Sequence, residues 1–106
     1  MVNLSPTVGA EITKTRPCVI TSSNEIGILP LKVIAPITDY KPHYESVPWM
    51  VELSPNGLNK LSKRSVVDLF QLRSVLQARL IRNIGKVTEE EFQRIFGAIK
   101  IVFGIY

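Results

Sequence analysis

The C-terminal segment carries the clearest pattern of apolar positions, and the pattern is that of a helix. From residue 92 to residue 103, apolar side chains recur at intervals of three and four, as on one face of an α-helix. Thr88 stands three residues before Glu91, which is the spacing of a reciprocal capping box. Further apolar residues, Ala98, Ile101 and Ile105, widen the surface beyond one stripe. Either a dimer contact or deeper burial in the chain's own core would account for this width.

Upstream of the helix, short apolar and β-branched segments alternate with Gly and Pro, which is typical of strands and turns. Strands are predicted at residues 17–22, 31–38, 47–53, 65–72 and 81–87. Pro36 is expected to interrupt or bend the second of these strands. The third alternates cleanly, so Trp49 is expected on its core face. Residues 74–80 are ambiguous, and a single helical turn is one reading of them.

These elements predict a mainly β fold, a small and strongly bent antiparallel sheet or barrel with the helix packed on it. The chain of 106 residues is long enough for one core, so residues 1–106 are expected to form a single domain. Ser54–Gly57 is a strong turn signal, and Met1–Leu4 is expected to be a short extended start. Glycine-rich phosphate loops and the GxSxG nucleophile motif do not occur, which leaves most enzyme classes unsupported.

Charge is distributed unevenly along the chain. Residues 1–59 carry a net charge of −1, whereas residues 60–86 carry +6. The cations of the second stretch are Lys60, Lys63, Arg64, Arg73, Arg79, Arg82 and Lys86. This excess indicates a polyanion or an acidic partner lying across one part of the surface, and a solvated basic face explains it equally well.

The cysteine and the N-terminus indicate the environment of the chain. Cys18 is the single cysteine and has apolar neighbours, which predicts a buried thiol without a disulfide. The lack of a CxxC motif and of a histidine pair argues against a zinc site, and no cofactor is expected. No signal peptide and no long apolar run occurs, so we expect a cytoplasmic protein without a membrane segment.

Lys14–Ile20 is the stretch in which chemistry is most concentrated. A cationic turn leads directly into a β-prone run, and Arg16 stands at the mouth of the expected strand. An arginine held there can be aimed outward, and its planar guanidinium suits a phosphate. Because many surface turns carry an arginine, this signal is weak by itself.

Three blocks of the chain make the signal specific. They are Pro6-Thr7-x-Gly9-x-Glu11 followed by Lys14-Thr15-Arg16-Pro17, then Ala35-Pro36-Ile37-Thr38, then Ser65-Val66-Val67 through Gln71-Leu72-Arg73-Ser74. In this order they resemble the MazF/PemK family of toxins from bacterial type II toxin-antitoxin systems. Gly85-Lys86-Val87-Thr88 and the acidic, amphipathic helix that follows also resemble that family, so the likeness covers essentially the whole chain.

The resemblance implies a small SH3-like antiparallel barrel of the MazF/CcdB type with a C-terminal α-helix, acting as a homodimer and inhibited by a cognate acidic antitoxin. The implied activity is that of a metal-independent, sequence-specific endoribonuclease, an mRNA interferase, which cleaves single-stranded RNA through the ribose 2′-hydroxyl. Arg16 and Thr38 occupy the positions that the family links to catalysis.

The chemistry of that reaction fits these residue types. Arg16 can stabilise charge on the phosphorane by bidentate contact, because a guanidinium keeps its charge at any working pH. Thr38 could donate a hydrogen bond to the phosphate, and Glu11 could orient Arg16. His43 is a candidate base, although a lone loop histidine is more often simply solvated. The residues expected to contact RNA are Lys14, Thr15, Gln71, Arg73, Lys63, Arg64 and Arg79.

Two departures from the family pattern leave alternatives open. Most of the family's first strand is expected to be missing, since the chain starts at Met1-Val2-Asn3-Leu4. In the strand after Ser65, Asp68 and Phe70 stand where family members carry an arginine and an acidic residue, which leaves the RNA sequence preference and the activity open. One alternative is a relative that only binds an antitoxin or nucleic acid. The other is a CcdB-like gyrase poison on the same fold, against which the blocks around Arg16 and Thr38 argue.

Overall fold

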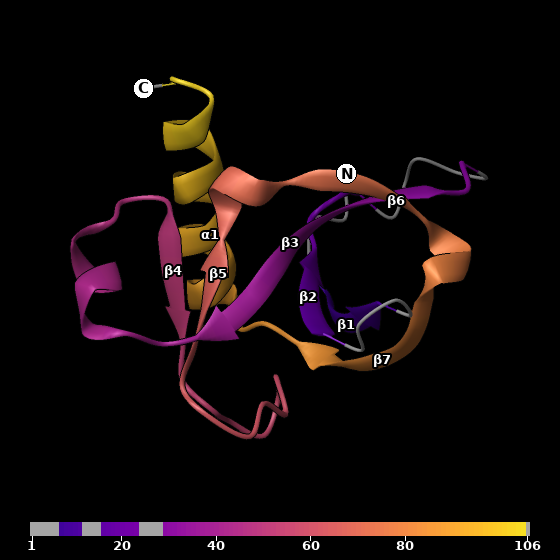
Figure 1. Ribbon diagram of the computed structural model, residues 1–106, viewed down its shortest axis with the longest axis horizontal. Helices are drawn as coiled ribbons and strands as arrows, with labels where there is room; N and C mark the ends of the chain where they lie inside the picture. Colours follow the sequence, from indigo (N-terminus) through magenta and orange to yellow (C-terminus); the bar gives the residue numbers. More distant parts are fainter. Residues whose placement is uncertain (1–6, 12–15, 24–28, 106) are drawn as a thin grey trace.

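The computed structural model describes residues 7–11, 16–23 and 29–105 (Figure 1). Their strands are β1 Thr7–Glu11, β2 Arg16–Ile20, β3 Leu31–Asp39, β4 Met50–Leu53, β5 Ser65–Asp68, β6 Arg73–Leu76 and β7 Leu80–Lys86. The 3₁₀ segments are η2 Pro42–Ser46, η3 Leu69–Gln71 and η4 Gln77–Arg79, and the helix α1 is Glu89–Val102. The extended start predicted for Met1–Leu4 lies outside the described residues.

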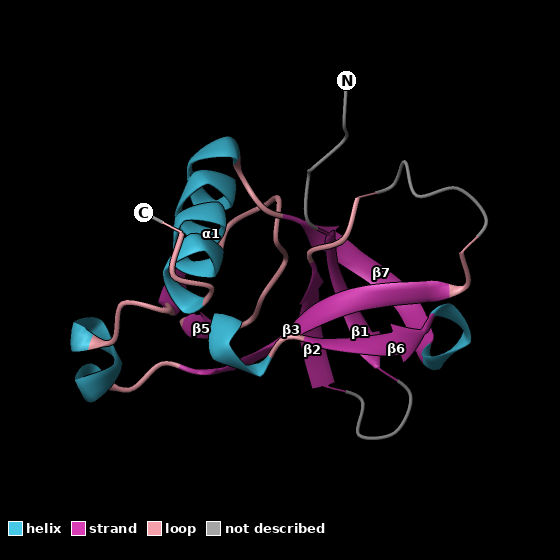
Figure 2. Ribbon diagram, turned by 90° about the horizontal axis from the view of Figure 1, so that it is seen from above, coloured by secondary structure: helices cyan, strands magenta, loops and turns pink. Residues whose placement is uncertain are grey.

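The strands form one antiparallel sheet that is organised around β3. The strand order is β4-β5-β3-β2-β1-β7, and β6 also pairs with β3. The mainly β prediction is therefore confirmed, but within the described residues the sheet does not close into a barrel, because this path ends at β4 and β7. At the β4 end, α1 packs against β4 and η3 and takes the place that a closing strand would fill. Figure 2 shows α1 beside β5, with β1, β2, β6 and β7 at the other end of the molecule.

The break expected at Pro36 does not occur, since β3 runs without interruption from residue 31 to residue 39. One edge of β3 pairs with β2 around Pro36. The opposite edge pairs with β6 as far as Ile34 and with β5 from Ile37 onward. Pro36 thus falls where that edge changes partner, and its missing N–H interrupts neither of these two ladders.

Two other strands are shorter than predicted. Residues 47–49 form a turn, in which the Met50 N–H donates to the Val47 carbonyl at 3.1 Å, so β4 starts only at Met50. Trp49 is half-buried against Phe70, with ring centroids 5.3 Å apart, rather than inside the core. β5 ends at Asp68 because its carboxylate accepts the Phe70 N–H at 3.0 Å and starts η3.

The remaining boundaries follow the pattern more closely. The ambiguous residues 74–80 divide between β6 and the 3₁₀ segment η4. The last predicted strand corresponds to β7, and the turn expected at Ser54–Gly57 forms slightly later, at residues 57–59. Cys18 is buried, as predicted, in a cluster with Ile34 and Val75.

The helix α1 begins as its sequence predicts and closes the main core. The Thr88 N–H donates to Glu91 Oε1 at 2.8 Å, and the Glu91 N–H donates to Thr88 Oγ1 at 3.1 Å, which completes the capping box. The buried core residues are Val19, Ala35, Ile37, Val51, Leu53, Val67, Leu69, Val87, Ile95 and Ala98.

The wide apolar surface of the C-terminal segment is only partly used by this core. Phe96, Ile101, Phe103 and Ile105 remain exposed, Phe103 by 64%. Exposed apolar side chains are thus left along the segment, with Phe96 and Phe103 seven residues apart on one side of it. Within the described part of the chain, no helix has the length and apolar character needed to span a membrane.

Candidate functional site

Arg16 and Thr38 lie at the same level of neighbouring strands. β2 and β3 pair in antiparallel register with Cys18 opposite Pro36, and continuing this register by two residues sets Arg16 opposite Thr38. Facing residues of such a pair project from the same face of the sheet. In β1, the backbone of Glu11 faces Arg16 in turn, and the side chain of Glu11 lies outside the described part of the chain. The three positions therefore form a row across β1, β2 and β3.

Arg16 and Thr38 also line one pocket, with a volume of about 400 Å³. One wall comes from the ends of β2 and β3, and the other from the segment between β4 and β5, including Ser62 and Lys63. Both Arg16 and Thr38 are exposed to solvent at this pocket. Among the described residues, Arg16 has no ion-pair partner. Its guanidinium is thus available to an anion that enters the pocket.

Two asparagines shape the segment that forms the second wall. The Asn56 carboxamide oxygen accepts the N–H groups of Leu58 and Asn59 at 2.9 and 2.7 Å. Asn59 is fully buried, and its oxygen accepts the N–H groups of Asn56 and Leu61 at 3.2 and 3.0 Å. The Asn59 side-chain nitrogen donates to the Ser54 carbonyl at 2.9 Å. These side-chain bonds pair backbone groups of an exposed turn around the buried Asn59.

Gly85 on β7 holds the same segment from the other side. The Lys86 N–H donates to the Leu58 carbonyl at 3.0 Å. A Cβ atom at Gly85 would lie 2.3 Å from the Leu58 oxygen and 3.0 Å from the Asn59 carbonyl carbon. Only glycine allows β7 to approach the segment this closely.

Lys63 and Asp39 form an ion pair in the pocket. Lys63 Nζ lies 3.2 Å from Asp39 Oδ2. The backbone of Lys63 is fixed by the buried Ser65, whose hydroxyl donates to the Lys63 carbonyl at 2.8 Å. Asp39 faces Ser65 across the β3–β5 ladder. The pocket thus combines two cationic side chains, Arg16 and Lys63, with one carboxylate.

The side chain of Arg64, the residue after Lys63, does not line this pocket. Its Nε and Nη2 atoms donate to the Glu52 carboxylate at 2.5 and 3.0 Å, and its guanidinium carbon lies 3.6 Å from the centre of the Tyr40 ring. The hydrogen bonds from Arg64 lower the pKa of Glu52, and Glu52 in turn raises the pKa of Arg64. A hydrogen bond to Glu45 raises the pKa of the Tyr40 hydroxyl. Arg64 therefore ties β4 to the end of β3 instead of lining the pocket.

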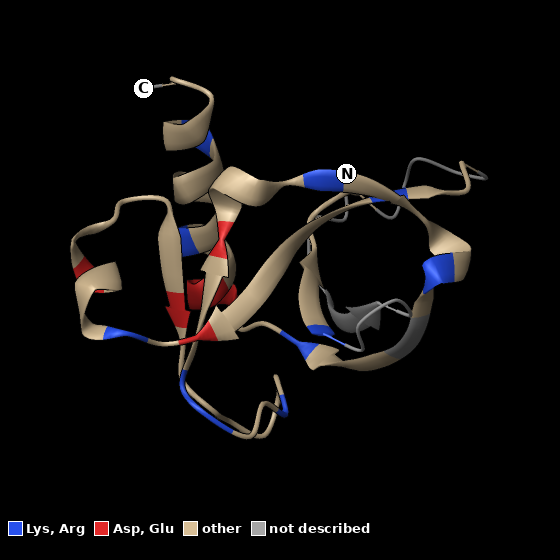
Figure 3. Cartoon of the chain, viewed as in Figure 1, with Lys and Arg blue, Asp and Glu red and all other residues tan. Residues whose placement is uncertain are grey.

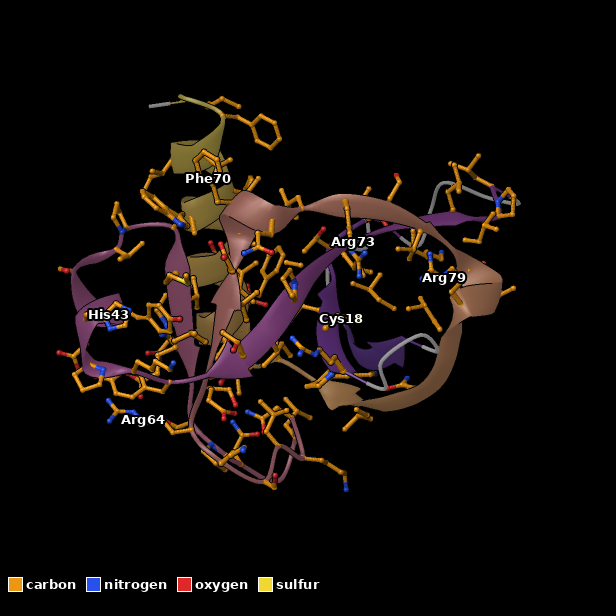
Figure 4. All side chains as sticks on the ribbon, in the orientation of Figure 1. Cys18, His43, Arg64, Phe70, Arg73 and Arg79 are labelled. Atoms are coloured by element: carbon orange, nitrogen blue, oxygen red, sulfur yellow. The ribbon has the colours of Figure 1, made fainter. Side chains whose placement is uncertain are left out.

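The other residues expected to bind RNA do not line this pocket either, as far as the described residues go. Gln71 donates to Asp68 Oδ2 at 2.8 Å on η3. Figure 4 shows Arg79 beside η4, at the opposite end of the molecule from Arg64, and Arg73 between them on β6. The same view has His43 on η2, away from β2. Lys14 and Thr15 lie outside the described residues.

The cations of the basic stretch come from several different elements. They belong to the β4–β5 segment, β6, η4 and β7 (Figure 3). Of the described cations in the β4–β5 segment, Lys63 lines the pocket, whereas Arg64 is paired with Glu52. Proximity along the chain therefore does not bring these cations to the pocket together.

A second pocket, of about 440 Å³, lies between η2, β4 and α1. Its polar groups are engaged within the protein, since Arg94 donates to the Glu52 carbonyl at 3.1 Å and Tyr40 donates to Glu45. It contains neither Arg16 nor Thr38. The pocket at the end of β2 and β3 is therefore the stronger candidate for phosphate chemistry. In the part of the chain that the structure describes, no three His, Cys, Asp or Glu side chains come together as metal ligands do.

The model of a family described as PemK-like, MazF-like toxin of type II toxin-antitoxin system matches residues 1–103. The chain belongs to this family. The pocket of Arg16 and Thr38 is thus a feature of a MazF-like chain, and it joins all three sequence blocks on which the resemblance rests, since Ser65 also lines it.

Solved structures of MazF-like proteins share the fold. The Mycobacterium tuberculosis toxin MazF-mt6 has a TM-score of 0.80 at 24% identity, over 95% of this chain and 98% of that chain. An endoribonuclease in complex with its cognate antitoxin, from Mycobacterial species, has a TM-score of 0.77 at 17% identity, over 100% and 97%. A MazE-MazF structure from Deinococcus radiodurans has a TM-score of 0.76 at 19% identity, over 100% of both chains. The antiparallel sheet with a C-terminal helix is accordingly the MazF fold.

The sequence indicated Arg16, Thr38 and Lys63 as functional residues, and the structure places all of them at this site. The sequence did not indicate Asp39. The visible signal for Asp39 was its place directly after Thr38, at the end of a strand. Its ion pair with Lys63 depends on the β3–β5 pairing, which no local pattern shows.

Proposed function

We propose that this chain is a metal-independent, sequence-specific endoribonuclease that cleaves single-stranded RNA, chiefly mRNA, at the pocket of Arg16 and Thr38. The observation that carries the proposal is that these two side chains, from separate sequence blocks, line one solvent-accessible pocket. A guanidinium without an ion-pair partner among the described residues, in one pocket with a hydroxyl, is a suitable arrangement for a phosphodiester.

The proposed reaction uses the ribose 2′-hydroxyl as nucleophile. Its oxygen attacks the adjacent phosphorus while the bond from phosphorus to the 5′-oxygen breaks, which leaves a 2′,3′-cyclic phosphate and a 5′-hydroxyl. Charge builds up on the non-bridging oxygens, where Arg16 binds in a bidentate manner and Thr38 donates a hydrogen bond. Glu11 orients Arg16, a role supported by its facing position in the β1–β2 ladder.

Basic and polar groups would hold the RNA. Lys63 lines the pocket itself, Gln71, Arg73 and Arg79 would contact the strand beyond it, and Lys14 and Thr15 precede Arg16 in the chain. Contacts from Lys and Arg to phosphates contribute salt-dependent affinity and no base preference. Arg64 contributes less, because Glu52 already neutralises it.

Two protein partners belong to the proposal. One is a second copy of the chain, supported by the exposed apolar side chains of Phe96 and Phe103, which a homodimer would cover. The other is a cognate acidic antitoxin that inhibits the enzyme, supported by the mycobacterial endoribonuclease bound to its antitoxin and by the MazE-MazF structure. With mRNA as substrate, the enzyme would act in the cytoplasm.

Cleavage of a long single-stranded RNA by the purified chain, in the presence of EDTA, tests the proposal. We expect fragments of defined length from the wild-type chain and intact RNA with Arg16→Ala and with Thr38→Val. Intact RNA with the wild-type chain, together with tight RNA or antitoxin binding, would support a binding role without catalysis instead. Inhibition of DNA gyrase without RNA cleavage would support the CcdB-like alternative.

A further inference from the structure

The proposed cleavage needs a proton for the departing 5′-oxygen, and Arg16 is a poor source because a guanidinium holds its protons too tightly. Among the described residues that line the pocket, the other groups with exchangeable protons are the hydroxyls of Thr38, Ser62 and Ser65, which are weak acids, and the ammonium of Lys63. An ammonium is a conventional general acid.

The position of Lys63 suits this task. Its ammonium lies 3.2 Å from the Asp39 carboxylate, and Lys63, Asp39 and Thr38 all line the pocket of Arg16. The Lys63 side chain is 67% exposed and that of Asp39 60%, which leaves the pair open to an incoming RNA strand. The backbone is nevertheless fixed, by the hydrogen bond from the Ser65 hydroxyl to the Lys63 carbonyl.

The adjacent Lys63 and Arg64 therefore have different surroundings. The Arg64 guanidinium is bound to Glu52 and stacked on Tyr40, whereas Lys63 lines the pocket with Arg16. By their charge alone, Lys63 and Arg64 would be equivalent contacts to the RNA backbone. The contacts assign only Lys63 to the reacting phosphate.

We propose that Lys63 is a catalytic residue that protonates the leaving 5′-oxygen, and that Asp39 is a positioning residue that holds it in the pocket that Arg16 and Thr38 line. The inference rests on the proposed ribonuclease function. In the step, the 2′-oxygen–phosphorus bond forms and the phosphorus–5′-oxygen bond breaks, with the 2′-hydroxyl proton released to solvent. The Lys63 ammonium gives one proton to the 5′-oxygen, and the resulting amine takes a proton back from water.

Asp39 has a second effect on the same step. A carboxylate next to a phosphodiester would repel it, but the ion pair with Lys63 makes the two side chains together neutral. When the phosphate arrives, the ammonium can move from the carboxylate toward the 5′-oxygen without leaving the pocket. Arg16 keeps its separate role at the non-bridging oxygens.

The test compares two RNA substrates that differ in one atom. In the first, the leaving atom at the cleaved bond is the normal 5′-oxygen; in the second it is sulfur, which departs without a proton. The variants are Lys63→Met and Asp39→Asn, with Lys41→Met as a matched control, since Lys41 is an exposed lysine outside the pocket. Single-turnover rates are corrected for cleavage without protein.

Loss of a general acid lowers a reaction rate on the order of 100-fold or more. We therefore expect Lys63→Met to cleave the oxygen substrate more slowly than wild type by that factor. On the sulfur substrate, its cleavage rate should stay within about threefold of wild type. Asp39→Asn should cleave the oxygen substrate about tenfold more slowly than wild type, and its rate on the sulfur substrate should be close to that of wild type. Lys41→Met should match wild type on both substrates.

Equal losses of Lys63→Met on both substrates would make Lys63 a phosphate-binding residue and overturn the assignment, as would no loss on either. An equal loss of Asp39→Asn on both substrates would overturn its positioning role. If the wild-type chain cleaved neither RNA, the proposed function itself would fail. A wild-type chain that cleaves while Lys63→Met cleaves equally well would refute only the further inference.

Discussion

Arg16 on β2 and Thr38 on β3 each lie two residues beyond the Cys18–Pro36 pair that ends the β2–β3 ladder, and both line the same pocket, although separate blocks of the sequence supply them. Their contributions are distinct, because each side chain reaches the pocket from its own strand. A substitution at one position should leave the other in place, since both residues are exposed and neither belongs to the core.

Arg16→Ala should lower the rate of RNA cleavage by about 100- to 1,000-fold, the usual cost of removing one donor to a developing oxyanion. Arg16→Lys should recover little of this activity, because an ammonium can't reproduce bidentate contact. Single-turnover cleavage rates measure the loss, and circular dichroism checks that the fold is kept. An Arg16→Ala chain that cleaves at the wild-type rate would contradict the proposed role.

Glu52→Gln should weaken folding in a pH-dependent way. The hydrogen bonds from Arg64 lower the pKa of Glu52 from its ordinary value of 4.5, so this pair stabilises the folded chain above that pH and stops doing so as the pH falls through the folded-state pKa. Urea unfolding should therefore separate wild type from Glu52→Gln at pH 7, and the difference in the free energy of unfolding should shrink as the pH falls below 4.5. A difference in the free energy of unfolding between wild type and Glu52→Gln that is the same at both pH values would contradict the stabilising role of the Arg64–Glu52 pair.

Gly85→Ala should destabilise the fold by about 1–3 kcal/mol, the typical cost of inserting a methyl group into a packed site. The added Cβ would meet the Leu58 carbonyl oxygen at 2.3 Å and push away the segment that carries Lys63. Gly57→Ala is the matched control, because a Cβ there meets nothing within 4 Å. Equal free energies of unfolding for the two variants would contradict the close approach of β7.

Thr88→Ala should cost about 1 kcal/mol of folding free energy, because it removes the N-cap oxygen that accepts the Glu91 N–H. Thr88→Ser retains a hydroxyl at the cap and serves as the control. Thermal unfolding of the three chains measures the effect. A Thr88→Ala chain as stable as Thr88→Ser would show that the capping box contributes little here.

Local patterns in the sequence predicted those features that depend on neighbouring residues. The helix with its cap at Thr88, the buried Cys18 and the last strand are of this kind, because periodicity and capping are encoded within a few positions. The ends of β4 and β5 were misjudged, since a turn at Val47 and the side chain of Asp68 decide them.

The candidate site was predictable only in part, for the same physical reason. The sequence blocks indicated Arg16 and Thr38, but the partners of Lys63 and Arg64 depend on pairing between β3, β4 and β5, which lie far apart along the chain. Two adjacent cations with the same apparent role therefore have different surroundings in the fold.

The central claim is that the pocket of Arg16 and Thr38 cleaves RNA through the ribose 2′-hydroxyl, and the chemical identity of the product ends tests it most directly. Mass spectrometry of fragments from a defined single-stranded RNA, cut by the purified chain in EDTA, should find a 2′,3′-cyclic phosphate on one fragment and a 5′-hydroxyl on the next. The same RNA with a 2′-deoxyribose at the cleaved position should remain intact. Fragments that end in a 3′-hydroxyl and a 5′-phosphate, or cleavage of the deoxy-substituted RNA, would contradict the account.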